Sequence, residues 1–415
     1  MVVLFKKTLT TLVLVSLSIW GVRYGMQWQQ VEERGYTYAP RELHDLRHFA
    51  DAWVDYGRKA WYENQLELAA DYFQHGLALN VLDVDAWLDL ARVEAEMGRR
   101  DIAGEILAFT DRLTHQVVKW KWAQLLLARD LGARDMVVGH INFLIPFRRL
   151  QTDALNLLDL HVEGDTGAAL EILDARNLPD YLTWLIRLKR PEDSLMVWAT
   201  LTEDQKQADN LYEKYVNFLV SQKQMPEAVD IWEHFSGHNG PANPGFEAPL
   251  SKNAFGWRTS PGKLWDIRQD RISPAEGRYA LRISFFGKEN VHFRHVRLLT
   301  PVRPGVDYRL SFQWRSRDLT TDQRPYIEVR GAQCTSEVWK SDMAPANAEW
   351  REASVLFTAP ESCRAVSVSL RRRPSRRFNS KIAGRLWLDD FRLTPLEQNQ
   401  PFIHQEQLNE PQQQQ

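Results

Sequence analysis

A period of 34 residues runs through the first part of the chain, and it restricts the fold more than any other feature of the sequence. Trp53 and Trp87 stand one period apart. A repeat of this length, with a large aromatic residue, a turn residue, a small residue and a second large residue, is typical of stacked helix–turn–helix units. Three further columns share the period: Asn64, Gly98 and Gly132; Ala69 and Ala103; Phe73 and Leu107.

The residue types in these columns suit packed helix pairs. The Trp wedges the first helix against its neighbour, and the Ala lets the second helix approach closely. Gly or Asn in the turn tolerates a positive φ. In the third unit the Trp position is taken by Lys121, with Trp120 and Trp122 on either side. A weaker repeat continues to Phe235, so we expect an α-solenoid of about five or six helix pairs over residues 50–237.

This pattern resembles the tetratricopeptide repeat (TPR) family, from Ala50 to about Leu150. The chain departs from the family at Val81, where the family usually has a Pro at the end of the second helix. The resemblance implies a protein partner bound on the concave face of the solenoid.

The helical pattern stops between residues 240 and 258, where three prolines and three glycines break any helix. Beyond it, apolar and polar residues alternate in short segments, as in residues 308–315, which is the pattern of a half-buried strand. The phase slips between Phe293 and Val296, which predicts a β-bulge near His295. Together the short strands predict an antiparallel β-sandwich over residues 240–396.

Several motifs follow one another in this part of the chain: NPGFE from Asn243, Gly256-Trp257, a Gly-Arg-Tyr at 277–279 and LWLDDF at 386–391. Their order resembles the galactose-binding-like jelly-roll carbohydrate-binding modules that are appended to bacterial glycanases. The resemblance implies a glycan ligand. It also implies a structural calcium held by Glu247 with Asp389 or Asp390, since hard carboxylate oxygens suit that ion. The alternative is that these carboxylates cap turns or pair with arginines.

The candidate glycan site lies on the outward faces of the predicted strands. Flat aromatic side chains with planar polar groups beside them are what a sugar site needs. The alternative is a solvated polar face. Tyr326, Glu328 and Arg330 share one outward row, Gln313 and Arg315 belong to another, and Trp339 is expected in a loop.

Charge is divided unevenly along the chain. Residues 243–394 contain 27 Lys and Arg against 16 Asp and Glu, an excess of 11 positive charges in a chain whose net charge is −2. This basic half predicts an acidic polysaccharide ligand, and two ordinary solvated surfaces are the alternative. Residues 371–377 contribute five arginines, which we expect in a loop. Aromatic residues do not interleave with them, which disfavours nucleic acid as a partner.

The two cysteines of the chain, Cys334 and Cys363, both fall in the strand-rich half. A disulfide and two buried free thiols both fit such a pair.

The N-terminus begins with a charged and then an apolar segment. Lys6 and Lys7 precede an uncharged run from Thr8 to Val22, which Arg23 ends. A cleaved signal peptide and a retained anchor both start in this way. Because no A-x-A cleavage site follows, we expect a single-pass inner-membrane anchor at 1–25, a linker at 26–49 and the bulk of the chain in the periplasm. The Gln-rich residues 397–415 are expected to be disordered.

The sequence contains no G-x-S-x-G, phosphate-loop, H-E-x-x-H or C-x-x-C motif. We therefore expect a multidomain α and β protein without enzymatic activity or a cofactor beyond the candidate calcium. Its expected role is that of a membrane-anchored periplasmic scaffold in exopolysaccharide or cell-envelope assembly. Two alternatives remain. One is a glycan-processing enzyme, which needs two carboxylates roughly 5–10 Å apart in a cleft. The other is a structural scaffold without a ligand.

Overall fold

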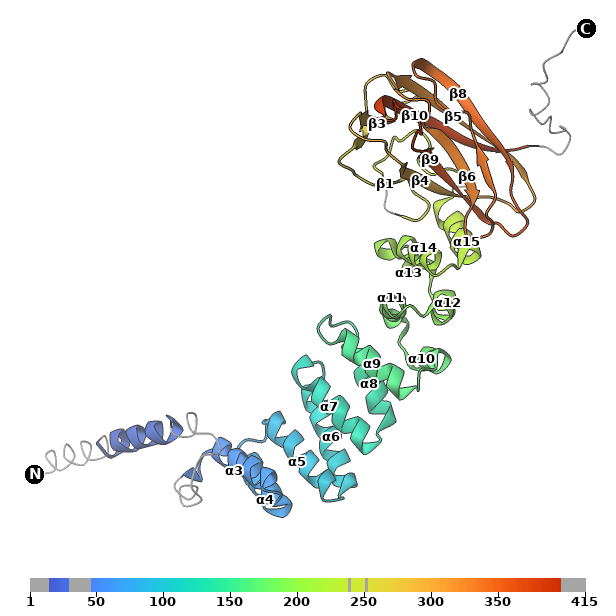
Figure 1. The fold of residues 1–415 in the computed structure, drawn as a ribbon. Coiled ribbons are helices and arrows are strands. Elements are labelled where there is room, and N and C mark those ends of the chain that lie inside the picture. The colour runs from blue at the N-terminus through green and yellow to red at the C-terminus, as the bar shows by residue number, and fades with distance from the viewer. Residues whose placement is uncertain (1–14, 30–45, 238–239, 251–252, 397–415) are drawn as a thin grey trace, which may run out of the picture. The chain divides into compact units, whose positions relative to one another are not determined.

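The computed structural model describes residues 15–29, 46–237, 240–250 and 253–396. The chain divides into two compact units, residues 1–184 and residues 185–415 (Figure 1). The first unit is helical, and the second contains the last helices and a β-sandwich. The predicted classes of structure, helix first and antiparallel strands after it, are therefore confirmed.

The helices of residues 50–236 follow one another as pairs joined by short turns. The first three pairs are α3 (Ala50–Tyr62) with α4 (Leu66–Leu79), α5 (Val84–Glu96) with α6 (Arg100–Thr114), and α7 (Val118–Leu131) with α8 (Arg134–Leu144). They are followed by α9 (Gln151–His161) with α10 (Thr166–Ile172), α11 (Leu178–Leu188) with α12 (Pro191–Thr200), the short α13 (Glu203–Gln207), and α14 (Leu211–Ser221) with α15 (Met225–Ser236). The division between the two units falls inside α11.

The 34-residue period is visible in hydrogen bonds as well as in residue types. The Trp53 indole Nε1 donates to the Arg47 carbonyl at 3.1 Å, and the Trp87 Nε1 donates to the Val81 carbonyl at 2.9 Å. In the second unit, the donor and the acceptor each lie 34 residues further along the chain than in the first unit. The turn residues Asn64, Gly98 and Gly132 all have positive φ, at 59°, 81° and 73°. The predicted helix–turn–helix repeat is confirmed, and its kinship with the TPR family stays an interpretation.

The third helix pair replaces the indole by a buried charge. Lys121 of α7 is only 3% exposed, and its Nζ lies 2.5 Å from Asp111 Oδ1 of α6. His140 of α8 is also buried, with its Nε2 3.7 Å from the same carboxylate. A buried ammonium group needs such an oxygen partner, because an unpaired charge is strongly disfavoured away from water.

Two five-stranded antiparallel sheets form the sandwich. Sheet one has the order β1-β4-β9-β6-β7, and sheet two has the order β2-β3-β10-β5-β8. Sheet one consists of β1 (Arg258–Thr259), β4 (Phe293–Pro301), β9 (Ala365–Arg372), β6 (Tyr326–Gly331) and β7 (Val338–Lys340). Sheet two consists of β2 (Trp265–Asp270), β3 (Ala280–Phe286), β10 (Ala383–Pro395), β5 (Asp307–Arg317) and β8 (Ala348–Thr358).

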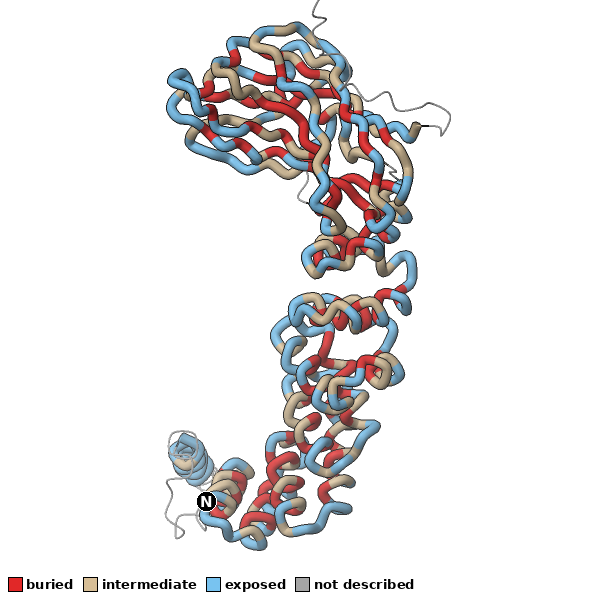
Figure 2. Tube along the Cα trace, turned by 45° about the vertical axis from the view of Figure 1, so that its right-hand side comes forward, coloured by how far each residue is buried: buried red, intermediate tan, exposed pale blue. Residues whose placement is uncertain are grey.

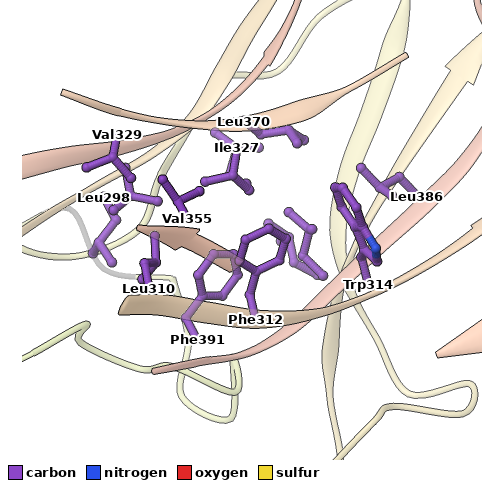
Figure 3. Close-up of a cluster of buried hydrophobic side chains, with 14 of the residues drawn as sticks. Leu298, Leu310, Phe312, Trp314, Ile327, Val329, Val355, Leu370, Leu386 and Phe391 are labelled. Carbon is purple, nitrogen blue, oxygen red and sulfur yellow. The ribbon is translucent and has the colours of Figure 1, made fainter. Parts of the chain in front are cut away.

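The core lies between the two sheets, where alternate residues of each strand point inward. Figure 3 shows side chains of both sheets meeting in this core, among them Leu298, Ile327 and Val329 of sheet one and Phe312 and Phe391 of sheet two. The ring of Phe312 stacks on that of Phe391, with 5.2 Å between their centroids. Figure 2 shows these buried positions as red segments along the strands.

The register of β4 against β9 shifts between Phe293 and Val296. This shift confirms the bulge that the change of phase in the sequence predicts near His295.

The last helix pair packs on the sandwich within the second unit. The Trp232 ring of α15 stacks on Phe255, with 5.4 Å between centroids. Gln333 Nε2 donates to the Val220 carbonyl of α14 at 3.0 Å. The break in sequence pattern near residue 240 is thus a change of secondary structure and does not separate the two compact units.

Cys334 and Cys363 form a disulfide. It joins the segment that follows β6 to the segment that precedes β9. Each half-cystine has a neighbour in the sequence that contacts the last helix pair: Gln333 reaches Val220, and Arg364 pairs with Asp230. Of the two alternatives that the sequence leaves open, the structure has the disulfide.

The N-terminal segment differs from the predicted membrane anchor. Residues 15–29 form a helix, while residues 1–14 and most of the predicted linker lie outside the described residues, as does the tail at 397–415. A membrane-spanning helix needs about 20 mainly apolar residues. Across the part of the chain that the structure describes, no helix combines that length with enough apolar character. This finding contradicts the predicted single-pass inner-membrane location with the bulk of the chain in the periplasm.

Candidate functional site

The outer face of sheet one carries a row of polar side chains that crosses all five strands. Residues paired in register on antiparallel strands share a face of the sheet, and their side chains are neighbours. Because Ile327, Val329 and Leu298 face the core, the residues that alternate with them face outward. The cross-sheet row consists of Lys340 on β7, Glu328 on β6, Ser369 on β9, Arg297 on β4 and Arg258 on β1.

Glu328, on the strand next to one edge of the sheet, lies between two guanidinium groups. Its Oε1 lies 3.5 Å from Arg330 Nη2 and 3.6 Å from Arg371 Nε. The carboxylate is only 6% exposed, so the arginines that flank it also cover it. Beside it, the hydroxyl oxygens of Ser367 and Ser369 lie 3.5 Å apart. The face therefore offers acceptors and donors in a fixed array.

Arg258 forms the end of the row nearest to the helices. Its Nη2 donates to Asn217 Oδ1 of α14 at 3.3 Å. Burial lowers the pKa of Arg258, and the positive charge of Arg297 lowers it further. Two guanidinium groups thus stand opposite each other at this end, which favours an electron-rich ligand there.

Tyr326 lies on the outer face with Glu328 and Arg330, as the alternation of residues predicts. Its side chain is only 7% exposed. Because a ring must be open on one side to stack against a sugar, Tyr326 offers little stacking area here. The sequence pattern shows the face to which a residue belongs but not the neighbours that cover it.

The other three residues of the predicted glycan site lie elsewhere. Gln313 and Arg315 belong to β5 of sheet two, on the opposite outer face of the sandwich. The Arg315 guanidinium lies over the Trp387 ring, 5.3 Å from its centroid. Trp339 lies in β7 rather than in a loop, and its ring packs against Phe357 of the core. The structure therefore does not bring the six residues into one site.

Two of the three candidate calcium ligands meet at the turn formed by residues 275–279. Glu247 Oε1 accepts hydrogen bonds from the backbone N–H groups of Arg278 and Tyr279, at 2.8 and 3.0 Å. Asp389 Oδ2 accepts from the N–H groups of Ala275 and Glu276, at 2.8 and 3.2 Å. Burial raises the pKa of Asp389.

Gly277 fits this turn closely. Its φ is +64°, and a Cβ added at this position would lie 2.3 Å from Glu247 Oε1. A side chain here would displace the carboxylate, so the glycine makes room for it.

The third candidate calcium ligand, Asp390, forms an ion pair with an arginine instead of capping the turn. Asp390 Oδ1 pairs with Arg392 Nε at 2.8 Å. No group of three or more acidic, His or Cys side chains suited to a metal ion occurs among the described residues. The carboxylates of Glu247 and Asp389 cap the turn, as the alternative interpretation expects. Their oxygens suit calcium in type, and the calcium itself stays a prediction.

The arginine run at 371–377 is not a uniform loop surface. Arg372 is the last residue of β9, and it is completely buried. Its Nε donates to the Gln323 carbonyl at 3.0 Å and its Nη2 to the Ser380 carbonyl at 2.8 Å. Asn290 Oδ1 accepts from both terminal nitrogens at 3.2 Å. Burial lowers the pKa of this guanidinium. Arg371 and Arg372 therefore belong to a strand and not to the loop that the sequence predicts for all five arginines.

Comparison with solved structures gives likenesses to the sandwich. No protein-family model matches the chain, and no curated protein matches it. A family 61 carbohydrate-binding module, solved in complex with β-1,4-galactotriose, is 18% identical, with a TM-score of 0.27 over 38% of this chain and 99% of that module. The C-terminal family 22 module of Clostridium thermocellum Xyn10B is 10% identical, with a TM-score of 0.29 over 38% and 93%.

A third likeness is to the enzymatically active domain of tailspike protein 4 of bacteriophage CBA120. It is 10% identical, with a TM-score of 0.30, and the match covers 38% of this chain but only 22% of the tailspike domain. The structures that resemble the β-sandwich of this protein thus include several carbohydrate-binding modules.

Proposed function

We propose that the β-sandwich is a non-catalytic glycan-binding module and that its site is the outer face of sheet one. The observation that carries this proposal is the position of Glu328 between Arg330 and Arg371, in the cross-sheet row. Binding sites for small polar ligands fix their orientation by a few precisely held polar groups. Glu328 is itself buried, so its carboxylate fixes Arg330 and Arg371, and these guanidinium groups donate to sugar hydroxyls.

The length of the row also suits an extended ligand. The row spans five strands, and neighbouring strands lie roughly 4.8 Å apart. The hydroxyl groups of Ser369 in the row and of Ser367 beside it both donate and accept. Successive sugar units of the ligand would form hydrogen bonds with successive polar residues of the row. Stacking of a sugar on Tyr326 would contribute little, because little of its ring is exposed.

Isothermal titration of the full chain with neutral and uronic-acid oligosaccharides tests this proposal. Galactotriose and xylohexaose belong in the panel. Replacing Glu328 by Gln keeps the shape of the side chain but weakens its hydrogen bonds, so we expect the affinity to fall by roughly tenfold, a change of about 1.4 kcal/mol. Glu352→Gln is the matched control, because Glu352 is an exposed carboxylate on β8 of sheet two.

Two results would contradict the proposal. If the unaltered protein binds none of the panel, the sandwich is a structural module. If Glu328→Gln and Glu352→Gln bind equally well, the site lies elsewhere. Incubation of the panel with the protein, followed by product analysis, checks the separate prediction that the chain is not an enzyme.

For the helix pairs of residues 50–184, the proposed role is to bind a protein partner. What supports it is the helix–turn–helix repeat, because stacked repeats present extended surfaces to other proteins. The setting in exopolysaccharide or cell-envelope assembly rests on the sequence resemblance and stays a prediction. Chemical cross-linking of the full chain in its native cells, with identification of the linked peptides, checks whether a partner contacts this segment.

A further inference from the structure

The outer face of sheet two contains a hollow of about 560 Å³ that none of the residues discussed above lines. It lies over β2, β3, β10 and the end of β5. Four arginines and two aspartates line it, so its charged groups carry a net positive charge. They are Arg268, Arg282, Arg317, Arg385, Asp266 and Asp318.

Two of these arginines stand directly opposite each other. Arg385 on β10 and Arg317 on β5 are paired in register, and both are exposed. Like charges in this position destabilise a sheet. Neither guanidinium forms an ion pair or hydrogen bond with any residue that the structure describes. An anion bound between them would remove the repulsion and fill both sets of donors.

Arg282 supplies a second, independent observation. Its Nη1 donates to Asp270 Oδ2 at 3.0 Å, which fixes the guanidinium in place. Its Nε is buried, and no acceptor for it exists within the described part of the chain. Buried donors without partners are rare, because each loses its hydrogen bonds to water. Arg282 Nη2 also lies 3.8 Å from Asp266 Oδ2, and Arg268 is paired with the same carboxylate at 2.6 Å. Arg317 and Arg385 are therefore the two lining arginines without an acidic partner among the described residues.

The edge of the hollow is aromatic. Phe286, the last residue of β3, lines it and is 47% exposed. Flat apolar rings beside a few convergent polar groups characterise sites for ring-shaped ligands. A cluster of arginines alone would suit any small anion. Because this hollow has an exposed aromatic ring beside its arginines, it suits an anion that carries a ring.

We propose that this hollow is a second binding site, for the carboxylate group of a uronic-acid saccharide. Arg317 and Arg385 hold the two carboxylate oxygens, and Phe286 contacts the sugar ring. Planar guanidinium groups match a carboxylate in two-pronged fashion. The site rests on residues separate from those of sheet one, so either proposal can fail without the other.

The test uses the full chain and trigalacturonic acid in isothermal titration, with its methyl ester as the neutral probe of the same shape. We expect the double variant Arg317→Gln/Arg385→Gln to bind trigalacturonic acid at least roughly tenfold more weakly. The methyl ester should bind equally to both proteins. The matched control is Arg294→Gln/Arg373→Gln, which removes two exposed charges from other parts of the sandwich and should change the affinity less than about twofold.

Several outcomes would overturn the proposal. One is an equal loss in the control variant, because the overall charge would then explain the binding. Another is loss of binding in Arg330→Gln but not in the double variant, which would assign the uronate to sheet one. Sodium sulfate that competes as tightly as trigalacturonic acid would show a general anion site. Absence of binding to the unaltered protein would also refute it. Thermal melts of each variant verify that it is folded.

Discussion

At the scale of single residues, Arg372 shows how far a side chain can depart from its neighbours in the sequence. Arg371 and Arg373 are accessible to solvent, while Arg372 is fully buried and holds three separate loops through carbonyl oxygens. The run RRRPSRR looks uniform in the sequence. Only the register of β9 and the positions of Asn290, Gln323 and Ser380 distinguish its members, and those residues are distant in the chain.

Replacing Arg372 by Ala should lower the free energy of unfolding by about 3–5 kcal/mol, because several buried carbonyl groups would lose their donor. Urea unfolding of the full chain measures the change. The neighbouring substitution Arg373→Ala is the control and should stay within about 0.5 kcal/mol, since it removes an exposed side chain. Equal effects of the two substitutions would show that the buried guanidinium has no special role.

At the scale of elements, the third helix pair shows what a periodic pattern can and cannot predict. Lys121 in a position held by Trp in the two earlier units is visible in the sequence. Its partners are not, because Asp111 and His140 belong to helices before and after it and occupy no repeated column. Periodicity gives the helices and their turns, whereas the replacement of an apolar contact by a buried charge cluster depends on individual side chains.

This cluster makes the first unit sensitive to acid. Burial lowers the pKa of His140, the Asp111 carboxylate opposes this shift and the Lys121 ammonium adds to it, so that the pKa falls from 6.5 to about 4. Between these pH values the unfolded chain binds a proton that the folded chain does not. Stability is therefore complete above pH 6.5 and falls as the pH drops towards 4, by about 3 kcal/mol at most.

Urea unfolding at pH 7.5, 5.5 and 4.5 measures this loss, in comparison with the variant His140→Gln. Because other groups titrate in the same range, the difference between the two proteins is the relevant quantity. We expect the variant to lose less stability as the pH falls. The same loss in both proteins would contradict the assignment to His140.

At the scale of the whole molecule, the change from helices to strands could be predicted from the prolines and glycines near residue 240, and the bulge in β4 from a change of phase. The candidate glycan site was predicted only in part. Alternation placed Tyr326, Glu328 and Arg330 on one face, but it could not show that β5 and β6 belong to different sheets. Sheet membership depends on long-range pairing, which local patterns do not contain. The packing of α14 and α15 on the sandwich is long-range in the same way.

Because of this packing, we expect the backbone amides of α15 and of the sandwich to lose their protection from hydrogen exchange together. Phe255 is fully buried and stacks on Trp232, so Phe255→Ala should destabilise the second unit by about 3–5 kcal/mol. Hydrogen exchange should then accelerate in α15 as well as in the sandwich strands, while α3 and α4 keep their rates. Unchanged exchange in α15 would show that the helix pair is stable without the sandwich.

The two sheets of the sandwich turn their outer faces in opposite directions, and this has a consequence for valency. With the sites proposed on both faces occupied, one module holds two saccharide chains, one on each side of a core roughly 10 Å thick. If both proposals hold, neither ligand hinders the other and the stoichiometry is two per protein. Such a protein would join separate polysaccharide strands into a network, and each copy would act as a non-covalent cross-link that weakens as salt concentration rises.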